Sequence, residues 1–252
     1  MKKIFRKTMI YIVGLALLVL GYLYLVNWSI YSRIQAAGLP AADTKYSYSV
    51  GDGNASSGSL VYAVLGDSLT SGVGVQSYEE SYPYLVATKL SQQRGVRVNL
   101  KTYACSGART RDLIEGFLDP AIAAQPDIVT LLIGTNDIHG RVGLETFGEN
   151  YEYILERLTR ETSAKIYLVG LPNIGSGGLL LPPYNYYFAR QTDSYNGVVK
   201  SLAEKYDLYF IDLNGATSSQ SRENGYYAKD SFHPSAEGYR LWAQIIYDNF
   251  DK

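Results

Sequence analysis

A continuous apolar run over residues 60–65 leads directly into Gly66-Asp67-Ser68, and this junction constrains the fold more than any other stretch of the chain. Apolar runs of this length are typical of strands that are buried on both faces of a parallel sheet. Ligands of open α/β sheets bind beyond the carboxyl ends of such strands. Ser68 is therefore expected at a ligand-binding edge, although an ordinary turn in which Gly66 relaxes the backbone would explain the same residues.

The chain after this junction alternates between strand and helix patterns. Four further strands are predicted at residues 96–105, 128–133, 165–170 and 208–213. The spacing of apolar residues predicts helices at residues 82–93, 110–125, 144–162, 186–205 and from Ser235 onward, with a break in the second at Asp119-Pro120. Alternation of this kind implies an α/β domain with a parallel sheet between two helical layers. Residues 60–252 are expected to form that domain.

The first 34 residues have the composition of a membrane-spanning segment. An uncharged stretch over residues 8–32, with an almost wholly apolar core at 9–26, follows four basic residues, Lys2, Lys3, Arg6 and Lys7. A run of this length can cross a bilayer as one helix, and the basic residues before it predict a cytoplasmic N-terminus. We expect an uncleaved signal anchor in the cell membrane, with the α/β domain outside the cytoplasm. The alternative is a signal peptide cleaved near Ala36-Ala37 and a secreted protein.

Residues 35–59 are mostly small, polar or Tyr, and we expect them to form a flexible linker.

The formal net charge of −1 at pH 7 makes nucleic acid an unexpected partner. Cys105 is the single cysteine, which excludes an intrachain disulfide and a cysteine zinc cluster. With two histidines besides, the sequence gives no reason to expect a metal or another cofactor. The oligomeric state cannot be read from these features.

Two histidines, His139 and His233, are candidates for the base that a serine nucleophile needs. His233 lies in Asp230-Ser231-Phe232-His233-Pro234, directly before the last predicted helix. A carboxylate three positions earlier can reach back across a turn and orient the imidazole, as the third member of a catalytic triad does. An Asp-initiated turn with a solvated histidine would explain the same pattern.

The ends of two other predicted strands supply donors for a developing oxyanion. Ser106-Gly107-Ala108 follows one of them, where Gly107 would let a backbone N–H approach a substrate closely. Gly134-Thr135-Asn136-Asp137 follows the next, and the carboxamide of Asn136 is an uncharged donor. Each stretch also has an ordinary interpretation, the first as a turn glycine and the second as an Asx turn.

These blocks together resemble the SGNH (GDSL-type) hydrolase family. The resemblance rests on four ordered motifs, Gly66-Asp67-Ser68-Leu69, Gly107, Gly134-Thr135-Asn136-Asp137 and Asp230-x-x-His233. It covers the chain from about residue 60 to the end and implies a flavodoxin-like, three-layer α/β fold with a five-stranded parallel sheet of order 2-1-3-4-5. The family also implies hydrolysis of a carboxylic ester through an acyl-enzyme.

Carried over position by position, the resemblance implies a catalytic triad of Ser68, His233 and Asp230. It implies an oxyanion hole made by the backbone N–H groups of Ser68 and Gly107 and by the side chain of Asn136. The second motif departs from the family pattern Asn-x-Gly-x-Ser-Gly, because Thr102 and Ala104 stand in place of Asn and Gly. That departure puts a hydrogen bond of the missing Asn and the local strand packing in doubt.

The substrate is less constrained than the reaction. Ester lipids and O-acylated glycans of the cell envelope are the expected substrates, with thioesters or lysophospholipids as alternatives. The apolar loop at residues 175–183, with Tyr184, predicts either an acyl-contacting lid or a cover of the core, and its candidate contacts are Leu179, Leu180, Leu181 and Tyr184. A conventional α/β-hydrolase would need Gly-x-Ser-x-Gly, which the chain lacks. A non-catalytic flavodoxin-like binding module is the rival class, although the chain contains no phosphate-binding P-loop motif.

Overall fold

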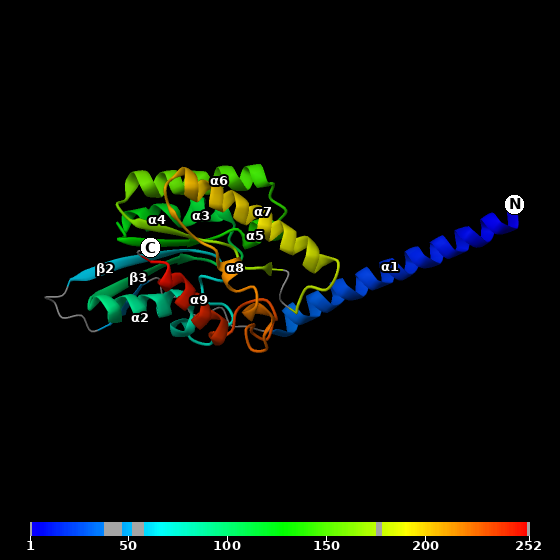
Figure 1. Cartoon of the computed structure of the whole chain (residues 1–252), viewed down its shortest axis with the longest axis horizontal. Coiled ribbons are helices and arrows are strands. Elements are labelled where there is room, and N and C mark those ends of the chain that lie inside the picture. The colour runs from blue at the N-terminus through cyan, green and yellow to red at the C-terminus, as the bar shows by residue number, and fades with distance from the viewer. Residues whose placement is uncertain (1, 38–46, 52–57, 175–177, 251–252) are drawn as a thin grey trace.

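The computed structural model describes residues 2–37, 47–51, 58–174 and 178–250. They form a three-layer α/β domain from which one long helix projects (Figure 1). The sheet has the order β1-β3-β2-β4-β5-β6, and every strand except β1 runs parallel to its neighbours. Its strands are β1 (Ser47–Val50), β2 (Ser59–Gly66), β3 (Arg97–Ala104), β4 (Ile128–Leu132), β5 (Lys165–Val169) and β6 (Tyr209–Ile211). The parallel part confirms the expected order 2-1-3-4-5.

Strand β1 corrects the expectation of a linker over residues 35–59. It pairs antiparallel with β3 at the edge of the sheet, and its Val50 is buried. Tyr48 stacks on Tyr78, with ring centroids 4.9 Å apart, and meets Tyr84 edge-on. Four residues with alternating Ser carry too weak an apolar pattern to be separated from a linker. The remaining linker residues, 38–46 and 52–57, lie outside the described part of the chain.

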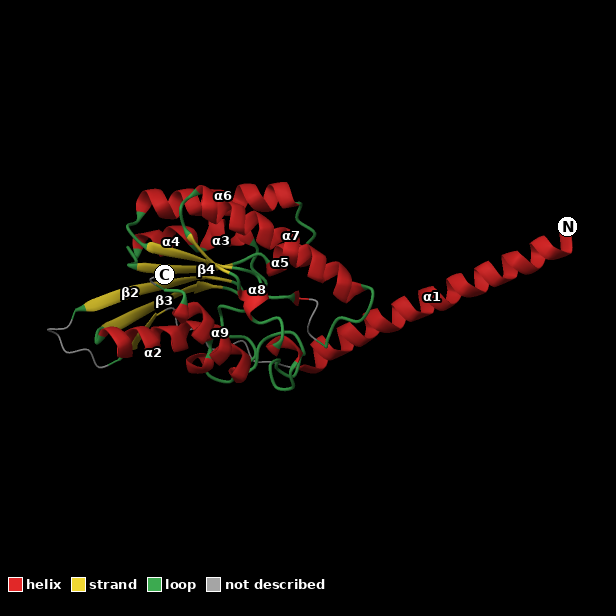
Figure 2. Ribbon diagram, in the orientation of Figure 1, coloured by secondary structure: helices red, strands yellow, loops and turns green. Residues whose placement is uncertain are grey.

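Helices cover both faces of the sheet (Figure 2). On one face lie η1 (Tyr78–Glu80), α2 (Tyr82–Arg94) and α9 (Ala236–Asp248). The other face carries α3 (Thr110–Gly116), α4 (Leu118–Ala123), α6 (Leu144–Glu161) and α7 (Tyr184–Lys205). The short elements α5 (Thr135–His139), α8 (Leu213–Ala216) and η3 (Gln220–Arg222) lie in connections. The main predicted helices are therefore present, with boundaries that differ by a few residues.

Two of those differences have simple physical causes. The helix expected over residues 110–125 breaks at Phe117 rather than at Asp119-Pro120. Pro120 instead lies in the first turn of α4, where a helix does not need the N–H that proline lacks. The short helix α5 was not predicted, because five residues after a strand give no helical periodicity to detect.

The register of the sheet brings three loops to one edge. Gly66, at the end of β2, lies opposite Ala104 of β3 and Leu132 of β4. The segments that carry Ser68, Gly107 and Asn136 therefore leave the sheet side by side. Gly66 has to be glycine at this junction, because a Cβ there would lie 2.1 Å from Thr70 Oγ1 and 2.4 Å from the Leu132 carbonyl oxygen.

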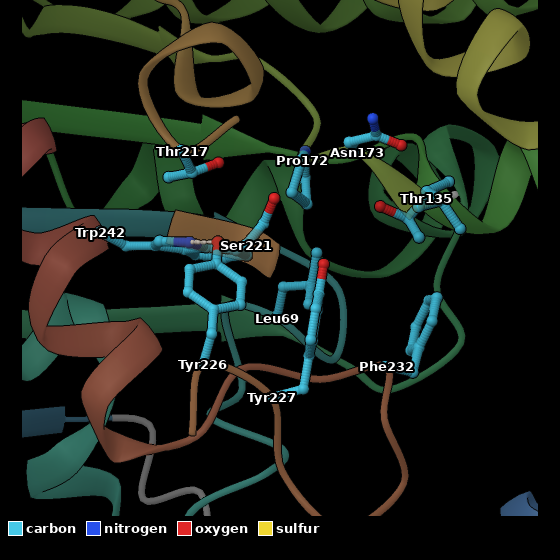
Figure 3. Close-up of a pocket in the computed structure, with 11 residues that line it drawn as sticks. Leu69, Thr135, Pro172, Asn173, Thr217, Ser221, Tyr226, Tyr227, Phe232 and Trp242 are labelled. Atoms are coloured by element: carbon cyan, nitrogen blue, oxygen red, sulfur yellow. Dashed lines mark hydrogen bonds between the residues drawn. The ribbon is translucent and has the colours of Figure 1, made fainter. Parts of the chain in front are cut away.

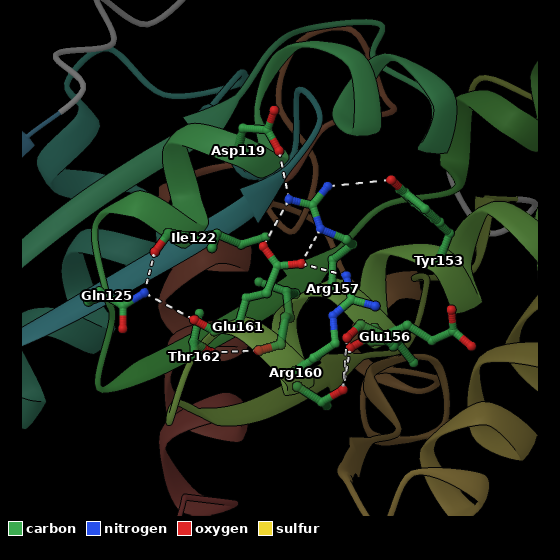
Figure 4. A network of polar contacts seen from close by, with 12 residues as sticks. Asp119, Ile122, Gln125, Tyr153, Glu156, Arg157, Arg160, Glu161 and Thr162 are labelled. Carbon is green, nitrogen blue, oxygen red and sulfur yellow. Dashed lines mark hydrogen bonds and ion pairs between the residues drawn. The ribbon is translucent and has the colours of Figure 1, made fainter.

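A polar network fastens the C-terminal end of α6 to α4, away from these loops (Figure 4). Arg157 donates to Asp119 Oδ1 at 2.9 Å and also pairs with Glu161. Gln125 Nε2 donates to the Glu161 carbonyl oxygen at 3.0 Å. Arg157 and Glu161 thus form several contacts at once, and the network connects the end of α6 to α4.

Helix α1 (Lys2–Ala37) extends from the domain and then packs against it over its last turns (Figure 1). Its segment Ile4–Ile30 is long and apolar enough to cross a membrane, and most of its side chains are exposed. Near the domain, Val26 is 2% exposed and Ile30 packs on the core. The helix thus continues past the expected end of the anchor at residue 34.

Candidate active site

Ser68, His233 and Asp230 form one chain of hydrogen bonds at the carboxyl edge of the sheet. His233 Nε2 lies 2.9 Å from Ser68 Oγ, and His233 Nδ1 lies 2.5 Å from Asp230 Oδ2. A carboxylate at Nδ1 favours the tautomer with the proton on that nitrogen, which leaves Nε2 free to accept a proton from the serine. The structure thus brings together three side chains that the sequence separates by up to 165 positions.

The turn that holds His233 is organised by Asp230. Asp230 Oδ1 accepts hydrogen bonds from the backbone N–H groups of Phe232 and His233, both at 3.0 Å. Burial by itself raises the pKa of Asp230, but the hydrogen bond from His233, the charge of its ring and the two backbone donors outweigh burial and lower that pKa. Asp230 is therefore an anion near neutral pH, suited to stabilise an imidazolium.

The segment after this turn is fixed by the start of α9. Ser235 is the N-cap of α9, and its Oγ accepts from the N–H groups of Glu237 and Gly238. Its own N–H donates to the Tyr226 carbonyl oxygen at 2.9 Å. A cap of this kind contributes about 1 kcal/mol to a helix, and here it also sets where the histidine turn ends.

A cavity of about 390 Å³ opens beside this chain. Its lining residues are Ser68, Val73, Ser106, Gly107, Asn136, Phe232 and His233. Gly107 has a φ of +83° although no atom lies within 4 Å of a Cβ placed there, so its backbone conformation rather than its surroundings selects glycine. All three expected oxyanion donors border one cavity.

The carboxamide of Asn136 is held from two sides. Its Nδ2 lies 3.1 Å from the Ala108 carbonyl oxygen and 3.3 Å from Asp67 Oδ2. The next residue, Asp137, accepts from Thr110 N at 3.0 Å and from Thr110 Oγ1 at 2.6 Å. These contacts tie the loop after β4 to the start of α3, so they fix the position of Asn136 relative to Gly107.

Asp67 lies fully buried beneath the candidate nucleophile. Its Oδ1 accepts from the N–H of Leu69 at 3.0 Å. Burial raises the pKa of Asp67 to about 7, opposed by the Leu69 hydrogen bond and assisted by the charge of Asp137. The sequence pattern did not indicate this, because nothing in Gly-Asp-Ser reveals that a second carboxylate will be buried nearby.

Thr102, which stands where the family pattern has Asn, forms a hydrogen bond with a tyrosine. Thr102 is buried, and its Oγ1 lies 2.8 Å from the hydroxyl of Tyr78. That hydroxyl also lies 3.3 Å from the Thr70 carbonyl oxygen, in the turn that follows Ser68. The pair Thr102–Tyr78 therefore links β3 to this turn.

His139 lies on the wall of a second, larger cavity. Its ring is 5.2 Å from the ring of Phe188 and 5.5 Å from that of Phe232. Burial among these groups, and to a smaller extent the charge of His233, lower the pKa of His139. A neutral ring between two phenylalanines fits the expectation that His139 is a wall residue.

The larger cavity has a volume of about 1120 Å³ and meets the smaller one at Val73, Phe232 and His233. Of the four expected substrate contacts, Leu179, Leu180 and Tyr184 line it. Leu181 is not among its lining residues and is 39% exposed, so its contact with a substrate stays a prediction. Residues 175–177 of the loop lie outside the described part of the chain.

Two residues of α1, Asn27 and Ile30, also line the larger cavity. Sequence reasoning missed them because it treated the N-terminal segment as an independent anchor. The signal in the sequence was Asn27, a polar residue that directly follows the apolar core at residues 9–26.

A third cavity, of about 20 Å³, lies behind Leu69 (Figure 3). Trp242 Nε1 donates to the Tyr226 hydroxyl at 2.6 Å beside it, and Thr135 lines it. A space of this size has room for one water molecule rather than for a substrate. Among the residues that the structure describes, no three His, Cys, Asp or Glu side chains gather as metal ligands would.

The chain matches one family model over more than half of its length. The family model described as GDSL-like Lipase/Acylhydrolase matches residues 64–241. The chain belongs to this family. It is therefore a hydrolase of the esterase and lipase class, as the ordered motifs had indicated.

Relatives of this GDSL-like hydrolase include both esterases and lipases. An acetylxylan esterase of Geobacillus stearothermophilus is 28% identical over 160 residues, which cover 60% of this chain and 71% of that one. The spore germination lipase LipC of Bacillus licheniformis is 26% identical over 211 residues, which cover 74% and 94%. The crystal structure of the acetylxylan esterase Axe2 of G. stearothermophilus shares the fold, with a TM-score of 0.63, 21% identity and coverage of 77% and 94%.

The buried carboxyl group of Asp67 predicts a pH-dependent stability. Between about pH 4, where an unfolded Asp loses its proton, and about pH 7, the native state keeps that proton. The unfolding free energy should therefore fall as pH rises through this window, by up to about 4 kcal/mol. In Asp67→Asn, the free energy of unfolding should change less between pH 5 and pH 8 than in wild type. Urea unfolding at the two pH values, followed by tryptophan fluorescence, measures this difference. Asp193→Asn, at an exposed position, is the control. An equal pH dependence of the free energy of unfolding in Asp67→Asn and wild type would contradict the raised pKa of Asp67.

Proposed function

We propose that the chain is a serine ester hydrolase that works through an acyl-enzyme, with Ser68 as nucleophile, His233 as general base and Asp230 as the orienting acid. The observation that carries the proposal is the continuous chain from Ser68 Oγ through His233 to Asp230, with distances of 2.9 and 2.5 Å. Distances of this size are those over which a base can take the proton of a nucleophile.

In the proposed mechanism, Ser68 Oγ attacks the ester carbonyl carbon while its proton passes to His233 Nε2. The resulting oxyanion is stabilised by the N–H groups of Ser68 and Gly107 and by Asn136, which border one cavity. In the free enzyme, Asn136 Nδ2 donates its hydrogen bonds to Asp67 and to the Ala108 carbonyl oxygen. When substrate binds, one of these N–H groups turns to the oxyanion instead. His233 then protonates the leaving alcohol, and water hydrolyses the acyl-enzyme with His233 again as base.

The substrates that we propose are esters at the outer face of the cell membrane, either envelope lipids or O-acylated glycans. Support for this location comes from α1, which is apolar along Ile4–Ile30 and follows a basic tip. The contacts of Val26 and Ile30 with the domain favour an uncleaved anchor over a removed signal peptide. The relatives include an acetylxylan esterase and a spore germination lipase, so both substrate classes occur among similar chains.

Removal of either proton-transfer partner should abolish turnover. Ser68→Ala and His233→Ala are each expected to reduce hydrolysis of a chromogenic acetate ester to background, with unchanged circular dichroism. Because the members of a triad act as a unit, the double variant should be little worse than either single one. Ser194→Ala, at an exposed position on α7, serves as the matched control. Near-normal turnover by Ser68→Ala would refute the proposed mechanism.

Loss of the Asn136 carboxamide should slow the chemical step without a comparable loss of binding. For Asn136→Ala we expect kcat to fall by roughly 10² to 10³, the usual effect of losing one oxyanion donor, with a smaller change in KM. His139→Ala should have a much smaller effect than His233→Ala, since His139 packs between Phe188 and Phe232. Equal losses for the two histidine variants in steady-state kinetics would mean that the base has been misassigned.

An uncleaved anchor should leave the intact chain in the membrane. After cell fractionation, the protein should stay in the membrane fraction through washes with high salt and alkaline carbonate, and mass spectrometry should find its N-terminal segment. Protease added to intact cells from which the cell wall or outer membrane has been removed should digest the α/β domain, because the domain lies on the outer face of the cell membrane. Recovery of the mature protein from the medium, with an N-terminus near Ala37, would contradict the anchor.

A further inference from the structure

We propose that the last turns of α1 form one wall of the acyl-binding cavity, so that the substrates are long-chain acyl esters of membrane lipids that enter from the outer leaflet. The membrane anchor is then part of the binding site and not merely a tether. This inference rests on the proposed esterase function and narrows its substrate class.

The contacts between α1 and the cavity are specific. Asn27 and Ile30 line the cavity that meets the proposed catalytic site at His233. Asn27 Nδ2 donates to the hydroxyl of Tyr184 at 3.0 Å, and the Tyr22 hydroxyl donates to the Pro182 carbonyl oxygen at 2.8 Å. The two hydrogen bonds thus hold the helix against the residues that directly follow Leu179 and Leu180, and Val26 of the same helix is buried.

The level of the cavity relative to a bilayer follows from the helix geometry. About 20 residues of helix cross the hydrocarbon core of a membrane, so a span that begins at Thr8, directly after the basic tip, reaches the outer interface near Asn27. Asn27 and Ile30, less than one turn apart, then lie at the boundary with the lipid headgroups. Tyr186 and Tyr187, at the start of α7 close to α1, are exposed, and aromatic side chains of this kind favour that interface (Figure 1).

The lining favours an acyl chain over a glycan. Most of the residues around the cavity are apolar, including Ile30, Ile138, Leu179, Leu180 and Phe188. Its volume of about 1120 Å³ slightly exceeds the upper end of the roughly 300–1,000 Å³ found for small-molecule sites, far more than an acetyl group fills. The aliphatic side chains among these residues match an acyl chain better than they match the hydroxyl groups of a glycan.

Entry beside α1 also spares the acyl chain a passage through water. Each methylene group that leaves lipid for water lowers the population of the exposed chain about fourfold. A chain that passes from the bilayer into an apolar cavity bounded by the anchor avoids most of this loss. The position of α1 therefore accounts for how a lipid ester can reach a domain outside the membrane.

The test uses the full chain in phospholipid vesicles. Ile30→Trp should obstruct the cavity and lower the ratio of kcat/KM for a palmitoyl ester to kcat/KM for an acetyl ester about tenfold, the equivalent of roughly two buried methylene groups. Leu25→Trp is the matched control on the same helix, since Leu25 is 60% exposed and does not line the cavity. Its ratio should match wild type. Ile30→Ala, which removes wall contacts, should also lower the ratio and serves if the tryptophan variant does not fold.

A second measurement does not depend on turnover. Ser68→Ala protein in vesicles that contain a phospholipid with a photoreactive acyl chain should crosslink to the part of α1 around Asn27 and Ile30 and to the segment of Leu179 and Leu180. An unchanged kinetic ratio in both Ile30 variants, or crosslinks confined to the membrane-embedded half of α1, would overturn the inference. So would efficient cleavage of acetylated xylan with no cleavage of lipid esters. Failure of wild type to hydrolyse any ester would instead count against the proposed function.

Discussion

The contact between Ser68 and His233 depends on nearly every element of the domain. Ser68 follows the central strand β2, whereas His233 lies in a turn that directly precedes the last helix. Their 2.9 Å approach requires β2 to end where it does and α9 to pack on the same face as α2. The sheet register and the cap at Ser235 are therefore conditions for the proposed chemistry as well as for the fold.

Buried carboxyl groups beneath the site have an energetic cost that the surrounding hydrogen bonds partly offset. Asp137 satisfies both of its oxygens on Thr110, so its burial fixes two loops to each other. Asp67 receives one backbone N–H and a long contact from Asn136, and its pKa of about 7 reflects weaker compensation. Asp67, which orients the carboxamide of Asn136, is thus buried at a cost in stability, a frequent arrangement at functional sites.

The sequence predicted the parallel sheet and the candidate triad for local reasons. The strand at residues 128–133 is apolar at every position except Thr130, and the spacing from Asp230 to His233 is that of a single turn. Strand β1 was missed because its stability comes from pairing with β3 and from stacking on Tyr78, neither of which a four-residue pattern reveals. Likewise, the packing of Ile30 on the core depends on how α1 meets the domain. Long-range contacts of this kind leave no periodic signal.

The way α1 packs on the domain bears on how high Ser68 would lie above a bilayer. An anchor joined by a flexible segment would let the domain sample many heights and tilts above a bilayer. In the proposed membrane arrangement, a helix held by Tyr22, Val26 and Asn27 instead sets one distance between Ser68 and the hydrocarbon surface. The proposed enzyme would then select an ester bond by its distance from the bilayer centre, so that two lipids with identical acyl chains would differ as substrates when their headgroups place that bond at different heights.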